Sequence, residues 1–313
     1  MVEEARMNRL AIVPALALLL SATASAAVDP NLVGLVMPEA KVLYGIQVEQ
    51  TLASPFGQYA ISHLPQNEAM LRFQTATGFE LQRDLREVLV ASSTSGPFGD
   101  GSDALVLARG TFAPDKVLAL ATVMGAKVAD YRGVAMITPP QQRDARVFAF
   151  LDASTIAIGN ELAIRGAIDR HATMAVFAGP LFQKALDASA THDAWFATVT
   201  PLTDLMPSGA SASTGGFDPT ALLRSVIESW VGVHFDTGGL TLSAEALTHS
   251  ATEAQGLAGM LKLISGMVKD TPAAALQNAQ VTADGPVMRV ILTVTEQDLE
   301  RSFHGAAPRR AAR

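Results

Sequence analysis

The stretch VFAFLDASTIAIGNELAIRGAID, residues 147–169, decides the class of fold. Apolar residues alternate in 147–151 and again in 155–158, and the Asp-Ala-Ser turn between them predicts an antiparallel hairpin. Asn160 is a favourable N-cap for a following helix, whose apolar stripe holds Ile164 and Ile168. Consecutive strands followed by a helix predict an α+β fold, with mostly antiparallel strands and helices packed on one face.

The same order of elements recurs in the second half of the chain. Residues 280–294 read as another hairpin, and Thr295 begins another closing helix. Earlier segments correspond as well: 42–46 with 194–199, 88–91 with 230–235, 105–109 with 240–244, and 117–124 with 257–264. The second copy has no counterpart of the strand at 131–137. We interpret this as a duplicated unit; the alternative is a chance match between generic βα patterns.

The duplication sets the predicted boundaries. Residues 27–171 form the first α+β repeat, 172–191 a packed connector, and 192–305 the second repeat. Residues 306–313 form a small, basic tail that has nothing to bury, which predicts disorder. The two copies form either one body or two domains. A single body is favoured because a unit of about 130 residues leaves much of its apolar helix surface uncovered.

The N-terminus carries an export signal. Arg6 and Arg9 precede an apolar run at 10–20, and Ala24-Ser25-Ala26 fits a cleavage site. We expect a signal peptide over residues 1–26 and a periplasmic or secreted protein, cleaved near Ala26. The alternatives are an uncleaved anchor and a buried N-terminal helix. The segment 257–268 is too short to span a bilayer and contains Lys262, so no transmembrane span is expected in the mature chain.

Composition excludes several kinds of site. The 313 residues include no cysteine, which rules out disulfides, zinc–thiolate sites, iron–sulfur clusters and cysteine nucleophiles. The formal net charge is −7 and no basic run occurs in the body of the chain, so no nucleic-acid partner is expected. The histidines lack metal-ligand spacing, and neither a nucleophile elbow nor a phosphate-binding loop occurs. The sequence therefore predicts no catalytic residue, no metal and no cofactor.

Three residues are candidates for ligand binding. Arg109 and Arg132 each end or interrupt an apolar strand and each precede a glycine, and Tyr131 lies beside Arg132. A guanidinium beside glycine can meet an anionic group where the backbone approaches closely. We therefore expect binding at Arg109, Tyr131 and Arg132. The alternative is a structural ion pair or an exposed side chain at a strand end.

The long helix predicted over residues 250–269 has two interpretations. Ser250 and Glu253 form a capping box, and an apolar stripe runs from Leu257 to Val268. As a core helix it lies on the sheet, with Gly259 against a neighbouring element. The alternative is a helix that lines a groove for a lipid or a protein partner.

Short motifs resemble a known group. These are the segments 151–160 and 167–169, the stretch Ala108-Arg109-Gly110-Thr111-Phe112 with the later Tyr131-Arg132-Gly133, and residues 37–40. Here the chain resembles exported bacterial proteins that are catalogued as a domain of unknown function. The resemblance implies an exported, duplicated α+β protein. It implies no activity and no catalytic residue.

These observations predict a function only in outline. We expect an exported, non-enzymatic binding or scaffolding protein of the bacterial envelope, whose partner is an envelope protein or a hydrophobic or anionic small ligand. One alternative is an envelope hydrolase with a scattered acid–base site, which a polar cleft with two carboxylates or a His–Ser pair would favour. Another is a carrier of a hydrophobic ligand, which an apolar cavity between sheet and helix would favour.

Overall fold

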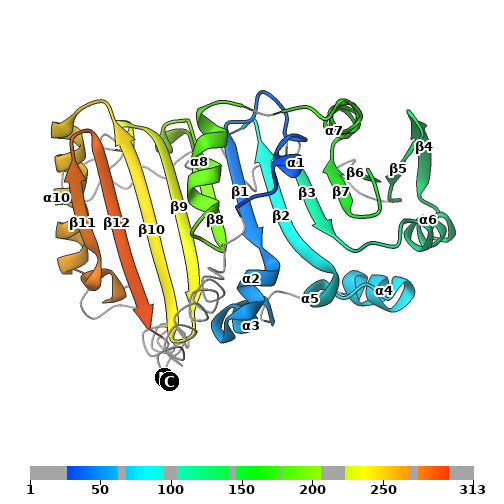
Figure 1. The fold of residues 1–313 in the computed structure, drawn as a ribbon, viewed down its shortest axis with the longest axis horizontal. Helices are drawn as coiled ribbons and strands as arrows, with labels where there is room; N and C mark the ends of the chain where they lie inside the picture. The colour runs from blue at the N-terminus through cyan, green and yellow to red at the C-terminus, as the bar shows by residue number, and fades with distance from the viewer. Residues whose placement is uncertain are drawn as a thin grey trace, which may run out of the picture.

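The computed structural model describes residues 27–62, 68–94, 104–140, 146–176, 178–205, 223–267 and 274–295. These residues build one sheet of 12 strands in which neighbouring strands are antiparallel. The strand order is β11-β12-β10-β9-β8-β1-β2-β3-β7-β6-β5-β4 (Figure 1). The predicted α+β class and antiparallel pairing are therefore confirmed.

The sheet has a central pair, β1 (Val42–Gln47) and β8 (Ala194–Thr198), with an N-terminal half on one side and a C-terminal half on the other. The N-terminal half continues with β2 (Leu85–Ser92), β3 (Ala104–Gly110), β7 (Thr155–Gly159), β6 (Val147–Phe150), β5 (Val134–Thr138) and β4 (Lys127–Tyr131). The C-terminal half continues with β9 (Val226–Asp236), β10 (Gly239–Thr248), β12 (Val287–Thr295) and β11 (Gln280–Asp284).

The two halves share an order of strands. Outward from the central pair, β1-β2-β3-β7-β6 faces β8-β9-β10-β12-β11, and the hairpin of β4 and β5 extends only the N-terminal half. This is the order that a duplication would produce. The single strand predicted at 131–137 is wrong, because Arg132 and Gly133 form the turn between β4 and β5. The duplication itself stays a prediction.

Helices lie on both faces of the sheet rather than on one. One face, here called the α8 face, carries α1 (Pro30–Val33), α7 (Glu161–Thr173) and α8 (Pro180–Ser189). The opposite face, the α10 face, carries α10 (Ala251–Met267) over the C-terminal half and α4 (Glu68–Thr77) and α6 (Pro114–Val123) over the N-terminal half. The remaining helical segments are α2 (Val48–Ala53), α3 (Pro55–Ser62), α5 (Leu81–Asp84), η1 (Leu202–Leu205) and η2 (Ala274–Asn278).

The main core fills the α8 face. Leu89, Leu107 and Ala157 lie side by side on β2, β3 and β7, and all three are fully buried. Helix α7 covers them with Ile164 and Ile168, and its Asn160 cap accepts a hydrogen bond of 2.8 Å from Ala163 N. Alternation along each strand places the polar residues Glu87 and Arg109 in the same layer as this core.

The predicted connector at 172–191 is mostly helical. Helix α7 runs on through Thr173, and Met174 ends it in the left-handed conformation, with φ 47°. Helix α8 then packs against β8, β9 and β1. The predicted signal peptide, the helix after Thr295 and the basic tail lie outside the described residues. Among the described helices, none is both long and apolar enough to cross a membrane.

Helix α10 lies on the sheet as a core helix would. Its Ala254, Leu257 and Ala258 are buried against β10, β11 and β12, and the Ser250 side chain caps it through Glu253 N. The expected contact at Gly259 is wrong. A Cβ built there meets nothing within 4 Å, because Gly259 lies on the solvent side of the helix.

Candidate functional site

An apolar space lies between the α10 face and the pair of helices α4 and α6. It consists of two cavities of about 400 and 640 Å³, which share Phe73 of α4 and Val117 of α6. The smaller one reaches the sheet at Ala108, Phe150, Ile156 and Ile158, and the larger one reaches it at Phe148. We call the two cavities together the apolar groove.

Aromatic side chains separate α4 and α6 from the sheet. Phe73, Phe79, Phe112 and Phe150 form a continuous series, with successive ring centroids 5.8, 6.0 and 5.9 Å apart. Such spacings are typical of attractive aromatic pairs. The four rings therefore line the smaller cavity as one packed series.

The local sequence places α6 over this groove. Strand β3 ends at Gly110, where a Cβ would lie 2.1 Å from the Asp84 carbonyl oxygen, so only glycine permits this close approach. Residues 111–113 then turn away, and Pro114 begins α6 at a position that needs no backbone donor. Val117 and Ala121 face inward, whereas Val123 and Met124 are exposed.

Two basic side chains line the smaller cavity. Arg83 is held by Asp84, with Nε 2.7 Å from Oδ1, and by the Gly78 carbonyl oxygen. Lys116 is exposed and forms no ion pair with any described residue. The groove therefore offers an apolar interior and one free cation beside it in the described part of the chain.

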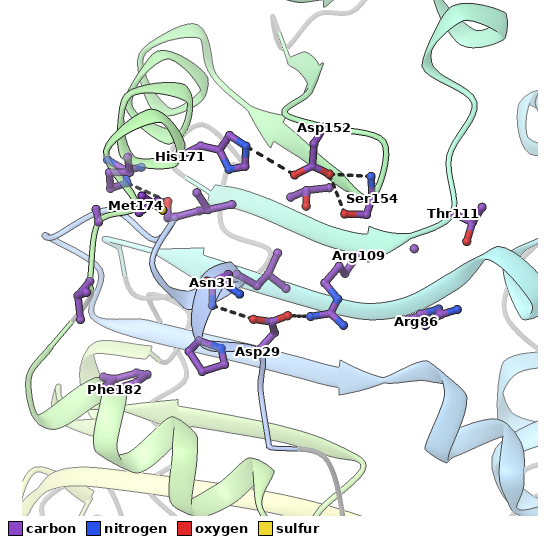
Figure 2. Close-up of a pocket in the computed structure, with 18 residues that line it drawn as sticks. Asp29, Asn31, Arg86, Arg109, Thr111, Asp152, Ser154, His171, Met174 and Phe182 are labelled. Carbon is purple, nitrogen blue, oxygen red and sulfur yellow. Dashed lines mark hydrogen bonds and ion pairs between the residues drawn. The ribbon is translucent and has the colours of Figure 1, made fainter.

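A polar pocket of about 640 Å³ opens on the α8 face (Figure 2). Arg109 points into it and forms an ion pair with Asp29, whose Oδ1 also accepts a hydrogen bond of 2.8 Å from Asn31 N. Asp29 thus fixes the N-terminal segment to β3. Sequence reasoning named Arg109 but missed Asp29, since the two are 80 positions apart and no local pattern joins them.

Asp152 organises the other side of this pocket. Its Oδ1 accepts hydrogen bonds from Ser154 Oγ at 2.7 Å and Ser154 N at 2.6 Å, and its Oδ2 lies 3.6 Å from His171 Nε2. Partial burial alone would raise the pKa of Asp152, but the hydrogen bonds from Ser154 and Thr155 outweigh it and lower the pKa. The serine proton points at the carboxylate and not at the histidine, so this arrangement does not activate the hydroxyl.

Tyr131 and Arg132 lie away from Arg109, at the turn between β4 and β5. Arg132 and Gly133 have φ of 53° and 81°, as a tight two-residue hairpin turn requires. Arg132 Nε lies 3.0 Å from Asp169 Oδ1 of α7, and Tyr131 OH donates to the same carboxylate. These contacts fasten the hairpin to α7. A binding role for the three predicted residues stays a prediction.

A neighbouring cavity of about 650 Å³ shares Asp29, Arg86 and Arg109 with the polar pocket and contains Glu87. Glu87 is 5% exposed and accepts hydrogen bonds from Gln47 Nε2 at 2.9 Å and Asp29 N at 3.2 Å. Burial raises its pKa to about 7, against the lowering effect of Gln47. The β2–β3 register shifts at Arg86, which makes Arg86 the extra residue of a β-bulge.

The sequence does contain a signal for the burial of Glu87, although no local motif marks it as a site residue. Glu87 is in phase with Leu89 and Ala91 on β2, so alternation alone places it on the core side of the strand. The phenylalanines of the groove have no such signal, because they come from four separate segments. In the described residues, no group of three or more histidine or acidic side chains could hold a metal ion.

Comparison with known proteins identifies the fold alone. No family model matches the chain, and no curated protein matches it either. Three crystal forms of TP0453 are similar to it in structure, with TM-scores of 0.55, 0.53 and 0.50 and sequence identities of 10%, 10% and 11%. The matches cover 88–90% of this chain and 97–98% of TP0453. This chain therefore shares its overall architecture with TP0453.

Proposed function

We propose that this protein is an exported, non-enzymatic binding protein of the bacterial envelope that carries a hydrophobic ligand in the apolar groove. The observation that supports this most is the groove itself. Its two cavities share Phe73 and Val117 and are bounded mainly by aromatic and aliphatic side chains of α4, α6 and the α10 face. Binding sites for small molecules are usually concave and mostly apolar, with few polar groups.

The ligand we propose has an acyl chain and an anionic end group. The chain would lie along Val117, Ala121 and Phe148 in the larger cavity. Lys116 beside the smaller cavity would meet the end group, since its charge has no partner in the described residues. The aromatic series is stiff and adds contact area without losing many rotamers on binding, which favours a preformed site.

Export is part of the proposal and rests on the N-terminal sequence. The apolar run and the Ala24-Ser25-Ala26 motif support cleavage after Ala26. Val28, only two residues further on, is already buried in the core. Buried residues thus follow directly after the proposed cleavage site. N-terminal sequencing of the exported protein should find Ala27 first, and soluble protein that retains residues 1–26 would contradict this part.

A hydrolase is less well supported. The polar pocket contains two carboxylates, but Asp29 is paired with Arg109 and the pKa of Asp152 is lowered. Neither group is suited to act as a protonated acid at neutral pH, which such a mechanism needs.

The test is native mass spectrometry of the protein purified from its own envelope. We expect an added mass that organic solvent extracts as an acyl-chain compound. Ala121→Phe should abolish the added mass, because Ala121 lines the larger cavity. The matched control is Ala119→Phe on the same helix, which faces solvent and should keep the ligand. Unliganded parent protein that also fails to take up a fluorescent fatty acid would refute the proposal.

A further inference from the structure

Glu87 is a buried carboxylate without a cation. Only 5% of its surface is exposed, and its hydrogen bonds come from the neutral donors Gln47 Nε2 and Asp29 N. In the described part of the chain, no lysine, arginine or histidine forms an ion pair with it. Its cross-strand neighbour Arg109 forms an ion pair with Asp29 instead. A buried charge is costly unless it is paired, and neither Arg86 nor Arg109, which line the same cavity, forms an ion pair with Glu87.

The N-terminal segment enters the same cavity. Ala27 and Asp29 line it together with Glu87, while the intervening Val28 is 1% exposed and donates its N–H to Ser189 Oγ at 3.0 Å. The Asp29 N–H binds Glu87 itself, two residues after Ala27. These contacts hold residue 27, which is itself exposed, at the edge of the cavity that Glu87 lines. Cleavage after Ala26 would create an α-ammonium group at this position.

We propose that the cavity beside Glu87 is a binding site for a primary ammonium group, and that its occupant is the free α-amino group of Ala27 after removal of the signal peptide. This inference rests on the proposed export and cleavage. The α-ammonium supplies the charge that Glu87 lacks. Signal-peptide removal then adds an ion pair within the cavity, so the processed chain is locked more firmly to β2 than the precursor.

Other charged groups face the same cavity. Asp29 is held by Arg109, Arg86 lies at the bulge, and Glu49 projects from α2 with an exposed side chain. Glu49 is therefore the one described carboxylate that could compete with Glu87 for the ammonium. Glu87 is buried and Glu49 is exposed. An ion pair therefore stabilises the charge of Glu87 more than that of Glu49, which water already solvates. The raised pKa of Glu87 is consistent with a carboxylate that has no positive partner as long as the nitrogen of residue 27 is part of a peptide bond.

The experiment compares chains that differ only before Ala27. One begins at Ala27 with a free amine, made by proteolytic removal of a fusion partner; the second has Gly-Ser-Gly before Ala27; the third is acetylated at Ala27. We expect the pKa of Glu87, followed by carboxyl NMR, to be at least one unit lower in the first chain. The α-amino pKa of Ala27 should lie above its ordinary value of about 8. The melting temperature of the two blocked chains should fall more steeply from pH 5 to pH 7.

Two variants identify the partner. Glu87→Gln should return the α-amino pKa of Ala27 to its ordinary value and remove the difference between the chains, whereas Glu49→Gln should leave both effects in place. Identical Glu87 titration in the three chains would overturn the inference, as would an effect that depends on Glu49 alone. Because the chains are prepared in vitro, a failure here is distinct from a failure of export, which N-terminal sequencing reports separately.

Discussion

Helices α6 and α10 occupy corresponding places in the two halves of the sheet, yet they pack differently. Each follows the third strand of its half, β3 or β10. Helix α10 lies directly on the strands through small side chains, with Ala254 and Ala258 buried. Helix α6 is separated from the strands by the apolar groove. The difference shows how one architecture gives a closed core in one half and a candidate binding site in the other.

The cause of the difference is side-chain size. Under α10, residues such as Ala244 and Ala246 let the helix approach the sheet. Under α6, Phe112 of the loop and Phe150 of β6 pack against each other with their rings tilted by 59°. Close packing beneath α10 therefore stabilises the C-terminal half, whereas the cavities beneath α6 leave the N-terminal half with fewer van der Waals contacts on this face.

The largest predicted effect concerns deletion of a core side chain. Leu257→Ala in α10 should lower the free energy of unfolding by about 2–5 kcal/mol, because Leu257 is 3% exposed and its loss leaves a cavity. Leu120→Ala in α6 should cost about 1 kcal/mol or less, because Leu120 already borders open space. Urea unfolding with fitted m values measures both. Equal losses would mean that α6 is packed as tightly as α10.

A second prediction compares the buried carboxylates of the two halves. Asp193 Oδ2 lies 3.0 Å from His234 Nδ1 and accepts the Phe235 N–H at 2.8 Å, whereas Glu87 forms no ion pair with a described residue. The folded-state pKa of Glu87, about 7, exceeds its ordinary value of 4.5. The contribution of Glu87 to the free energy of unfolding is therefore fully present below about pH 4.5. This contribution, roughly 3 kcal/mol, is lost as the pH rises through about 7.

The measurement is the stability of the amine-blocked chain between pH 4 and pH 8. Glu87→Gln should flatten the decline and stabilise this chain at pH 8. Asp193→Asn should instead destabilise it, because the buried carboxylate that accepts the Phe235 N–H and contacts His234 is lost. A parent chain whose stability rises from pH 5 to pH 8, with Glu87→Gln unchanged in slope, would contradict the assignment.

The third prediction uses one substitution in both helices. Ala258→Phe in α10 should overpack the contact with β11 and β12 and cost about 1–3 kcal/mol. Ala121→Phe in α6 should be tolerated or slightly stabilising, because the ring enters the larger cavity. Thermal unfolding of the two variants gives the sign of each effect. A similar loss in both would remove the contrast between the halves.

The smallest effect concerns the hairpin present only in the N-terminal half. Asp169→Asn removes the charge that holds Arg132 and weakens the contact with Tyr131. Since Arg132 and Asp169 are both substantially exposed, the cost should stay within about 1 kcal/mol. Ligand uptake should be unchanged in this variant. A large loss of uptake would instead support the predicted binding role of Tyr131 and Arg132.

Alternation and capping predict most of the fold from the sequence. The hairpin of β6 and β7, the Asn160 cap and the burial of Ile164 and Ile168 follow from local patterns that residues 147–169 contain in full. The presence of helices on both faces of the sheet does not follow from the sequence. The spacing of apolar residues shows which side of a helix is buried, but not which face of the sheet that side contacts. Arg109 was identified as a candidate site residue, but its partner Asp29 is distant in sequence, and so are the rings of the groove.

The central claim is that the space beneath α4 and α6 holds an apolar ligand, and a binding titration tests it most directly. A fluorescent fatty acid is titrated into the ligand-free parent, Ala121→Phe and Ala119→Phe, after thermal unfolding has shown all three to be folded. The account predicts saturable uptake of one equivalent by the parent and by Ala119→Phe, with loss of at least tenfold in affinity for Ala121→Phe. Equal uptake by all three proteins, or none by the parent, would contradict it.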